Sequence, residues 1–111
     1  MFNVERNGAV EVLTGDGPVT GESLDSLRTL WKIQVHGVPP RVVFDMSKVP
    51  LIDSRGLDWL CDTHDECSIR GGRLLLAAPT ALCGEILHVT GVDRYCRIVA
   101  DVQSGIGSFS L

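Results

Sequence analysis

The residues with the clearest chemical potential form a short turn, Asp53-Ser54-Arg55-Gly56, which follows an apolar stretch and directly precedes a helical pattern. A serine at a helix start is often only an N-cap, whose side-chain oxygen accepts a backbone N–H two or three residues further on. Asp53 is able to take that role instead, which would leave the Ser54 hydroxyl exposed. Free N–H groups at a helix N-terminus accommodate an anion, so a phosphate on Ser54 would be tolerated and would add roughly −1.5 to −2 charges. The residues alone allow phosphorylation of Ser54 and do not demand it.

A nucleophilic role for Ser54 would require a histidine as its base and an acid that orients this histidine. His36 and His88 lie in no motif that ties them to Ser54, and the chain has no G-x-S-x-G sequence. The glycines between residues 15 and 21 lack the Gly-Lys-Ser/Thr end of a phosphate-binding loop. We therefore predict that the chain is not an enzyme and has no cofactor.

Cys61, His64 and Cys67 are spaced three apart in one predicted helix and raise the question of a metal site. All three fall on the helix stripe that is expected to face the sheet, and no second cluster supplies a fourth ligand. Core packing is the preferred interpretation, with His64 half-buried and hydrogen-bonded, and no metal ligand is predicted.

The elements that must position the turn alternate between strands and helices after an opening hairpin. Asn7-Gly8 between two apolar-rich stretches is a strong hairpin signal, and Pro39-Pro40 cannot continue a helix. Gly71-Gly72 is suited to closing a helix, and Thr80 is a predicted N-cap. The predicted strands are 4–6, 10–13, 41–45, 73–78 and 97–100, and the predicted helices are 20–37, 54–70 and 81–89.

This order predicts an α/β fold, a mixed sheet of about four to five strands with helices packed on it, in a single domain over residues 1–111. The tail from 101 to 111 is weakly patterned and is expected to hold at most a short helix. Functional loops of such sheets gather beyond the C-terminal ends of parallel strands, which is where the Asp53-Ser54 turn falls.

The helix that follows the turn has two distinct faces. The stripe expected to face the sheet contains Leu57, Leu60, Cys61, His64 and Cys67. The face expected to meet water contains Asp58, Trp59, Asp62, Asp65 and Glu66. An exposed tryptophan one turn from Ser54 is the residue type that anchors interfaces. A tryptophan at this position could equally well serve to shield nearby loop residues from water.

The composition is that of an ordinary globular protein, with 22% charged and 44% hydrophobic residues. A net charge of −4 argues against binding to nucleic acid or to anionic membrane surfaces. No apolar run is long enough to span a membrane, and the first residues do not resemble a secretory signal. Four cysteines without C-x-x-C spacing are expected to be reduced thiols, so the predicted location is the cytoplasm.

Three segments of the chain together resemble the STAS domain family of bacterial anti-sigma factor antagonists. They are "VVFDMSKVPLIDSRGLDWL" at residues 42–60, "RGGRLLLAAPT" at 70–80 and "ILHVTGVDRY" at 86–95. The family pattern is an apolar strand that ends in Asp or Asn, a short loop, Asp-Ser-Ser/Thr-Gly-Leu at a helix start, a Gly-Gly turn, a strand and a TGL-like turn. The resemblance covers about residues 10 to 100.

The resemblance implies a small non-enzymatic switch that binds an anti-sigma factor, which is also a serine kinase, and is reset by a phosphatase. Ser54 would be the phosphoacceptor, Asp53 its acidic neighbour, Gly56 the point of close backbone approach and Leu57 the first core anchor of the helix. Partner binding would involve residues around the turn and in the loop after the second strand, namely Asp53, Arg55, Gly56, Asp58, Trp59 and Asp16. The oligomeric state is left open.

Two departures from the family pattern favour an alternative. Arg55 stands where the family has a second Ser or Thr, and it could pair with a phosphate or with an acidic partner. The family's early Gly-Glu-Leu-Asp-like segment is matched only loosely by residues 15–18. The alternative is a non-switching STAS scaffold in a larger complex, either stressosome-like or associated with a transporter, in which Ser54 is only part of a helix start.

Overall fold

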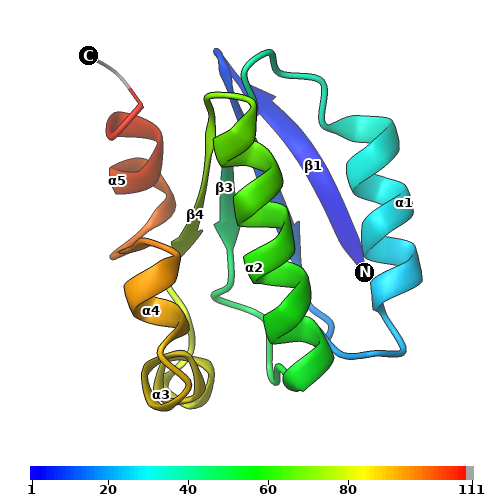
Figure 1. Ribbon diagram of the computed structural model, residues 1–111, viewed down its shortest axis with the longest axis vertical. Coiled ribbons are helices and arrows are strands. Elements are labelled where there is room, and N and C mark those ends of the chain that lie inside the picture. The colour runs from blue at the N-terminus through cyan, green and yellow to red at the C-terminus, as the bar shows by residue number, and fades with distance from the viewer. Residues whose placement is uncertain (110–111) are drawn as a thin grey trace.

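The computed structural model describes residues 1–109 and contains a five-stranded mixed sheet with the spatial order β1-β2-β3-β4-β5 (Figure 1). The first two strands are antiparallel, and each later strand pairs in parallel with the one before it. The strands are β1 (Phe2–Asn7), β2 (Val10–Gly15), β3 (Arg41–Asp45), β4 (Arg73–Ala77) and β5 (Ile98–Val99). The predicted α/β class and the mixed sheet are confirmed.

The opening hairpin is longer than predicted, and its turn is shifted by one residue. Asn7 pairs with Val10, so the two-residue connection is Gly8-Ala9 and not Asn7-Gly8. Gly8 has a φ of 63°, in the left-handed region that glycine enters without steric cost. The predicted hairpin is therefore confirmed, but the predicted position of its turn is wrong by one residue.

Helices cover both faces of the sheet. They are α1 (Leu24–Gln34), α2 (Ser54–Ile69), α3 (Ala81–Val89), α4 (Val92–Tyr95) and α5 (Val102–Gly107). Residues of α1, α2, α3 and α4 share one core cluster with one face of the sheet, and α5 packs on residues of the opposite face. In Figure 1, α1 and α2 run side by side across the near face, and β1 is visible behind the space between them.

Two helix predictions required correction. The helix predicted from Thr20 begins at Leu24, because residues 20–23 form a turn in which the Ser23 Oγ accepts the Thr20 N–H at 3.0 Å and donates to the Pro18 carbonyl at 2.7 Å. A serine that bonds its local backbone competes with helix formation. The short α4 was not predicted. The tail holds the six-residue α5, as expected, while residues 110 and 111 lie outside the described part.

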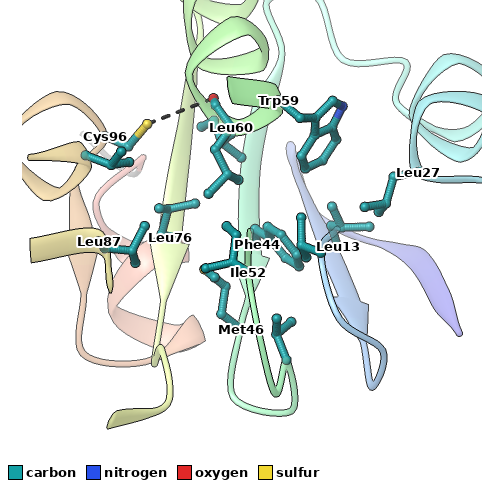
Figure 2. Packing of buried hydrophobic residues seen from close by; sticks show 14 of the residues in the cluster. Leu13, Leu27, Phe44, Met46, Ile52, Trp59, Leu60, Leu76, Leu87 and Cys96 are labelled. Atoms are coloured by element: carbon teal, nitrogen blue, oxygen red, sulfur yellow. Dashed lines mark hydrogen bonds between the residues drawn. The ribbon is translucent and has the colours of Figure 1, made fainter. Parts of the chain in front are cut away.

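The core follows from strand alternation. The larger cluster lies between the sheet and α1 to α4, and it includes Val42 and Leu74 from the central strands. Leu13, Phe44 and Leu76 of the same strands are labelled in Figure 2. The neighbouring residues Val43, Leu75 and Ala77 point to the opposite face, towards α5. Because successive strand side chains alternate between faces, continuously apolar strands such as β3 and β4 bury both sets of side chains.

Candidate functional site

The loops that follow β2 and β3 are joined to one another at the C-terminal edge of the parallel strands. Val19 and Ile52 form an isolated parallel bridge, in which the Val19 N–H donates to the Leu51 carbonyl at 2.9 Å. The Asp53 N–H donates in turn to the Val19 carbonyl at 3.2 Å. The turn at Asp53-Ser54 is therefore held against the loop after β2 by main-chain hydrogen bonds.

Asp53 is the N-cap of α2 and also a clamp on the neighbouring loop. Its Oδ1 accepts the Gly56 N–H at 2.8 Å, and its Oδ2 accepts the Gly21 N–H at 3.1 Å. These bonds, from Gly56 first and then from Gly21, lower the pKa of the Asp53 carboxyl below its usual value. The carboxylate is consequently ionised at neutral pH and holds two loops together.

Ser54 is the first residue of α2, and its side chain is exposed. Since Asp53 serves as the N-cap, Ser54 is not needed to satisfy the helix end, and its hydroxyl makes no hydrogen bond to residues 1–109. The first N–H groups of a helix have no acceptor within the helix, and they give this end a partial positive charge. Of the two N-caps that the sequence allows, Ser54 or Asp53, the structure has Asp53.

Gly56 permits the close approach of α2 to the loop after β2. A Cβ at this position would lie 2.1 Å from the Val19 carbonyl oxygen and 2.9 Å from Cγ1 of Ile52. No side chain larger than hydrogen fits without displacing main chain. The predicted close backbone approach at Gly56 is present. Leu57 is partly buried against the core cluster, which agrees with its predicted role as the first anchor.

Arg55 is exposed and lies over Gly21. Its Cδ and Nη1 are 2.9 Å and 3.1 Å from the position that a Cβ on Gly21 would occupy. A shallow depression beside Ser54 is lined by Arg55 and Asp53 together with Thr20, Gly21, Glu22 and Leu51. The sequence did not point to Thr20, Gly21, Glu22 or Leu51 as site residues. The first three fall inside the helix predicted over residues 20–37. Recognition of a turn at Gly21 to Ser23 would have placed these residues in a loop beside Ser54.

Asp16 lies apart from this depression. It is exposed, and its carboxylate pairs with the Met1 amino group at 2.5 Å. This contact is the main cause of the lowered pKa of Asp16, and Lys48 adds a smaller effect. Asp16 shares a separate hollow with Lys48 and Ser47, so it does not meet Asp53 or Arg55. Asp58 is exposed one turn beyond Ser54.

Trp59 is not on the surface, so the prediction of an exposed interface anchor is wrong. The residue is 5% exposed and lies edge-on between two other rings, with centroids 6.1 Å from Trp31 and 6.3 Å from Phe44. Figure 2 shows it among the core side chains near Leu60. The apolar stripe of α2 is centred on Gly56, Trp59, Leu60, Thr63 and Cys67. It is rotated from the predicted stripe because α1 covers the side of α2 that the sequence predicts to face water.

The cysteines and His64 belong to the packing of α2. Cys67 is buried, and burial raises its pKa to about 11. Cys61 is half-buried. Cys96 is buried, its thiol donates to the Leu60 carbonyl at 4.0 Å (Figure 2), and burial raises its pKa to about 12. The His64 ring stacks at an angle on Tyr95, with 5.1 Å between centroids. Within residues 1–109 the buried His64 Nδ1 has no hydrogen-bond partner, so the predicted hydrogen bond of His64 is absent at this nitrogen. Within residues 1–109 no three His, Cys, Asp or Glu side chains are arranged to hold a metal ion.

These features define a class of protein: a small α/β domain whose most distinctive surface is an exposed serine at a helix N-terminus, clamped to a neighbouring loop. The STAS domain family model matches residues 1–105, so the chain belongs to the STAS domain family. No curated protein matches the chain significantly. None of the helices within residues 1–109 has the length and apolar character that a membrane span requires.

Solved structures of several kinds share this fold. A candidate anti-sigma factor antagonist from Thermotoga maritima is 19% identical, with a TM-score of 0.88 over 96% of this chain and 92% of that one. A sulfate transporter family protein from Wolinella succinogenes is 20% identical, with a TM-score of 0.78 over 94% and 87% of the two chains.

The Bacillus cell fate determinant SpoIIAA, an anti-sigma factor antagonist, has been solved in two forms that both resemble this chain. The unphosphorylated form is 12% identical, with a TM-score of 0.70 over 98% of this chain and 96% of that one. The phosphorylated form is 14% identical, with a TM-score of 0.69 over 98% and 99% of the two chains. At these identities the likeness concerns the fold alone.

Proposed function

We propose that this chain is a partner-switching regulator of the anti-sigma factor antagonist type, controlled by phosphorylation of Ser54. In this proposal it acts in the cytoplasm, has no catalytic activity of its own, and regulates sigma-factor-dependent transcription. Its partners would be an anti-sigma factor with serine kinase activity and a phosphatase. The observation that carries the proposal is the exposed Ser54 hydroxyl at the first position of α2, left free because Asp53 caps the helix.

The local electrostatics suit such a switch. The positive end of α2 and the Arg55 guanidinium both favour a phosphate at Ser54. The same phosphate would bring roughly −1.5 to −2 charges beside the Asp53 carboxylate. Repulsion would then weaken the Asp53 hold on Gly21, so a modification of one hydroxyl would alter the loop after β2 as well. The fold shared with SpoIIAA, which has been solved in a phosphorylated form, adds support.

The test is incubation with ATP and each serine-kinase anti-sigma factor of the source organism, followed by intact mass measurement. Wild type is expected to gain one phosphate, Ser54→Ala none, and the control Ser47→Ala one. Ser47 is a suitable control because it is also exposed and lies in the loop that leads to the site. Phosphate incorporation into Ser54→Ala would show that the site assignment is wrong.

A pull-down with the same anti-sigma factors tests the consequence of the modification. Wild type and Ser54→Ala should retain the partner, and Ser54→Asp should lose it. Equal retention of all three would contradict the switch.

The alternative is a constitutive STAS scaffold in a larger complex. It is favoured by the position of Arg55, which already lies over Gly21 beside Ser54, and by the fold shared with a sulfate transporter family protein. For a scaffold, gene neighbourhood should show a transporter or a stressosome-like set of genes. For the switch, it should show an ATPase related to histidine kinases next to a sigma factor gene.

A further inference from the structure

A cleft separates α1 from α2 on the face of the sheet that both helices cover, and it has no part in the proposed function. Its accessible floor is the half-buried Trp31, and the ring of the buried Trp59 lies against it at 89°, so that edge and face are in contact. The phenyl ring of Phe44 supports Trp59 from below in the same edge-on manner. The floor therefore offers the aromatic ring of Trp31, packed on two further rings, and aromatic side chains are enriched where partners anchor.

The two walls of the cleft carry opposite charges along most of their length, and Arg70 adds a cation at the C-terminal end of the α2 wall. Arg28 and Lys32 lie one turn apart on α1, and Asp62 and Glu66 lie one turn apart on α2. All four side chains are exposed. Within residues 1–109 no ion pair joins the two walls, and Arg28 only approaches Asp25 of its own helix, at 3.8 Å. Two facing rows of opposite charge that do not pair with each other leave both rows available to a third element.

The shape of the cleft indicates a linear occupant. The lining residues on the α2 side run from Trp59 to the C-cap Arg70, which at 1.5 Å per residue is roughly 16 Å. Both walls are helices, whose main-chain groups are bonded internally, so they offer no strand edge to an extended peptide. A helix satisfies its own main-chain groups and needs only side-chain contacts.

We propose that the α1–α2 cleft is a docking site for an amphipathic helix of a partner protein. This helix would carry an apolar stripe for the tryptophan floor, acidic residues on the side facing α1 and basic residues on the side facing α2. The proposal is independent of Ser54 phosphorylation, since it involves neither the N-terminal turn of α2 nor the loop after β2.

Three synthetic helical peptides of roughly 14 residues provide the probe. All have the same leucine stripe. One is flanked by glutamates on one side and lysines on the other, the second by glutamates on both sides, and the third by lysines on both. Both tryptophans of the chain lie on the floor of the cleft, so intrinsic fluorescence reports on this site alone. We expect the mixed peptide to bind about threefold to tenfold more tightly than the other two, the range given by a few exposed ion pairs.

Charge reversal of one wall supplies the matched test. The double variant Arg28→Glu, Lys32→Glu makes the α1 wall acidic and so places it opposite the acidic pair Asp62 and Glu66, and it should prefer the peptide with lysines on both sides. The control Arg94→Glu, Arg97→Glu makes the same change of net charge at exposed residues outside the cleft, and it should keep the preference of the wild type. Equal binding of the three peptides to wild type, or an unchanged preference in the cleft variant, would overturn the proposal.

Sedimentation of the protein alone tests the competing occupant. A dimer that forms without peptide and is abolished by Arg28→Glu, Lys32→Glu would show that a second copy fills the cleft. That result would overturn the assignment to a separate partner. A monomer that binds the mixed peptide supports the assignment.

Discussion

At the scale of single residues, Asp53 is the side chain that organises the site. Its type and position predicted an acidic neighbour of Ser54, and its alternative role as N-cap was also foreseen. The hydrogen bond from the Gly21 N–H to the second carboxylate oxygen of Asp53 was not predicted, because a contact across 32 positions depends on how two loops meet. A local pattern can identify a cap, but a clamp between segments distant in sequence requires the fold.

A second residue-scale interaction lies between α3 and α4. His88 Nδ1 is 2.8 Å from Oδ2 of Asp93, and this hydrogen bond, together with the charges of Asp93 and Glu85, raises the pKa of His88 above its usual value. We predict an imidazole pKa above about 6.5 by NMR titration, and a return towards that value in Asp93→Asn. An unchanged pKa in Asp93→Asn would contradict the pairing.

The pH dependence of stability follows from the sign of this shift. A group whose pKa is raised on folding binds protons more tightly in the folded state, so its contribution is fully present below the unfolded pKa of about 6.5. The contribution is lost as the pH rises through the folded pKa. Urea unfolding below a pH of about 6.5 and above the folded pKa of His88 measures this contribution. The stability advantage of wild type over Asp93→Asn should be larger at the lower pH.

At the scale of elements, the sequence predicts what is locally encoded. Strands β3 and β4 and helices α2 and α3 begin and end within a residue or two of the predicted positions, because apolar runs, the Gly-Gly turn and Thr80 mark them. Thr80 accepts the Cys83 N–H as an N-cap should. The start of α1 was misplaced, since the serine-centred turn before it resembles a helix in its pattern. The predicted buried face of α2 was wrong, because the pattern of one helix does not show that both the sheet and α1 pack against it.

The junction between α2 and the loop after β2 yields a prediction at this scale. Gly56→Ala would place a Cβ 2.1 Å from the Val19 carbonyl, and the required displacement should lower the free energy of unfolding by about 1–3 kcal/mol. Gly84→Ala in α3 is the control, because its nearest contact would be at 3.9 Å. That variant should be stabilised by about 0.4–1 kcal/mol through reduced entropy of the unfolded chain. Urea unfolding measures both, and equal effects would show that the close approach is unimportant.

At the scale of the whole molecule, the two tryptophans connect layers that the sequence presents separately. Trp31 on α1, Trp59 on α2 and Phe44 on β3 form one continuous set of edge-on contacts. The family pattern and the periodicity of the elements were enough to predict the mixed sheet. They could not predict the contact between α1 and α2, which places Trp59 in the core and leaves a charged cleft above it. The candidate partner surface is thereby divided in two: the turn at Ser54, and the cleft farther along the same helix.

The buried position of Trp59 gives the sharpest prediction at this scale. An exposed interface anchor could be truncated without loss of stability, whereas truncation of a large core side chain costs about 3–5 kcal/mol. We expect Trp59→Ala to show a loss of this size in urea unfolding, and Trp59→Phe to lose less because it keeps a ring between Trp31 and Phe44. Ile69→Ala, on the same helix but 86% exposed, should change stability by no more than about 0.5 kcal/mol. If Trp59→Ala were as stable as Ile69→Ala, Trp59 would not be a core residue, and the contact between α1 and α2 would have to be different from the one described.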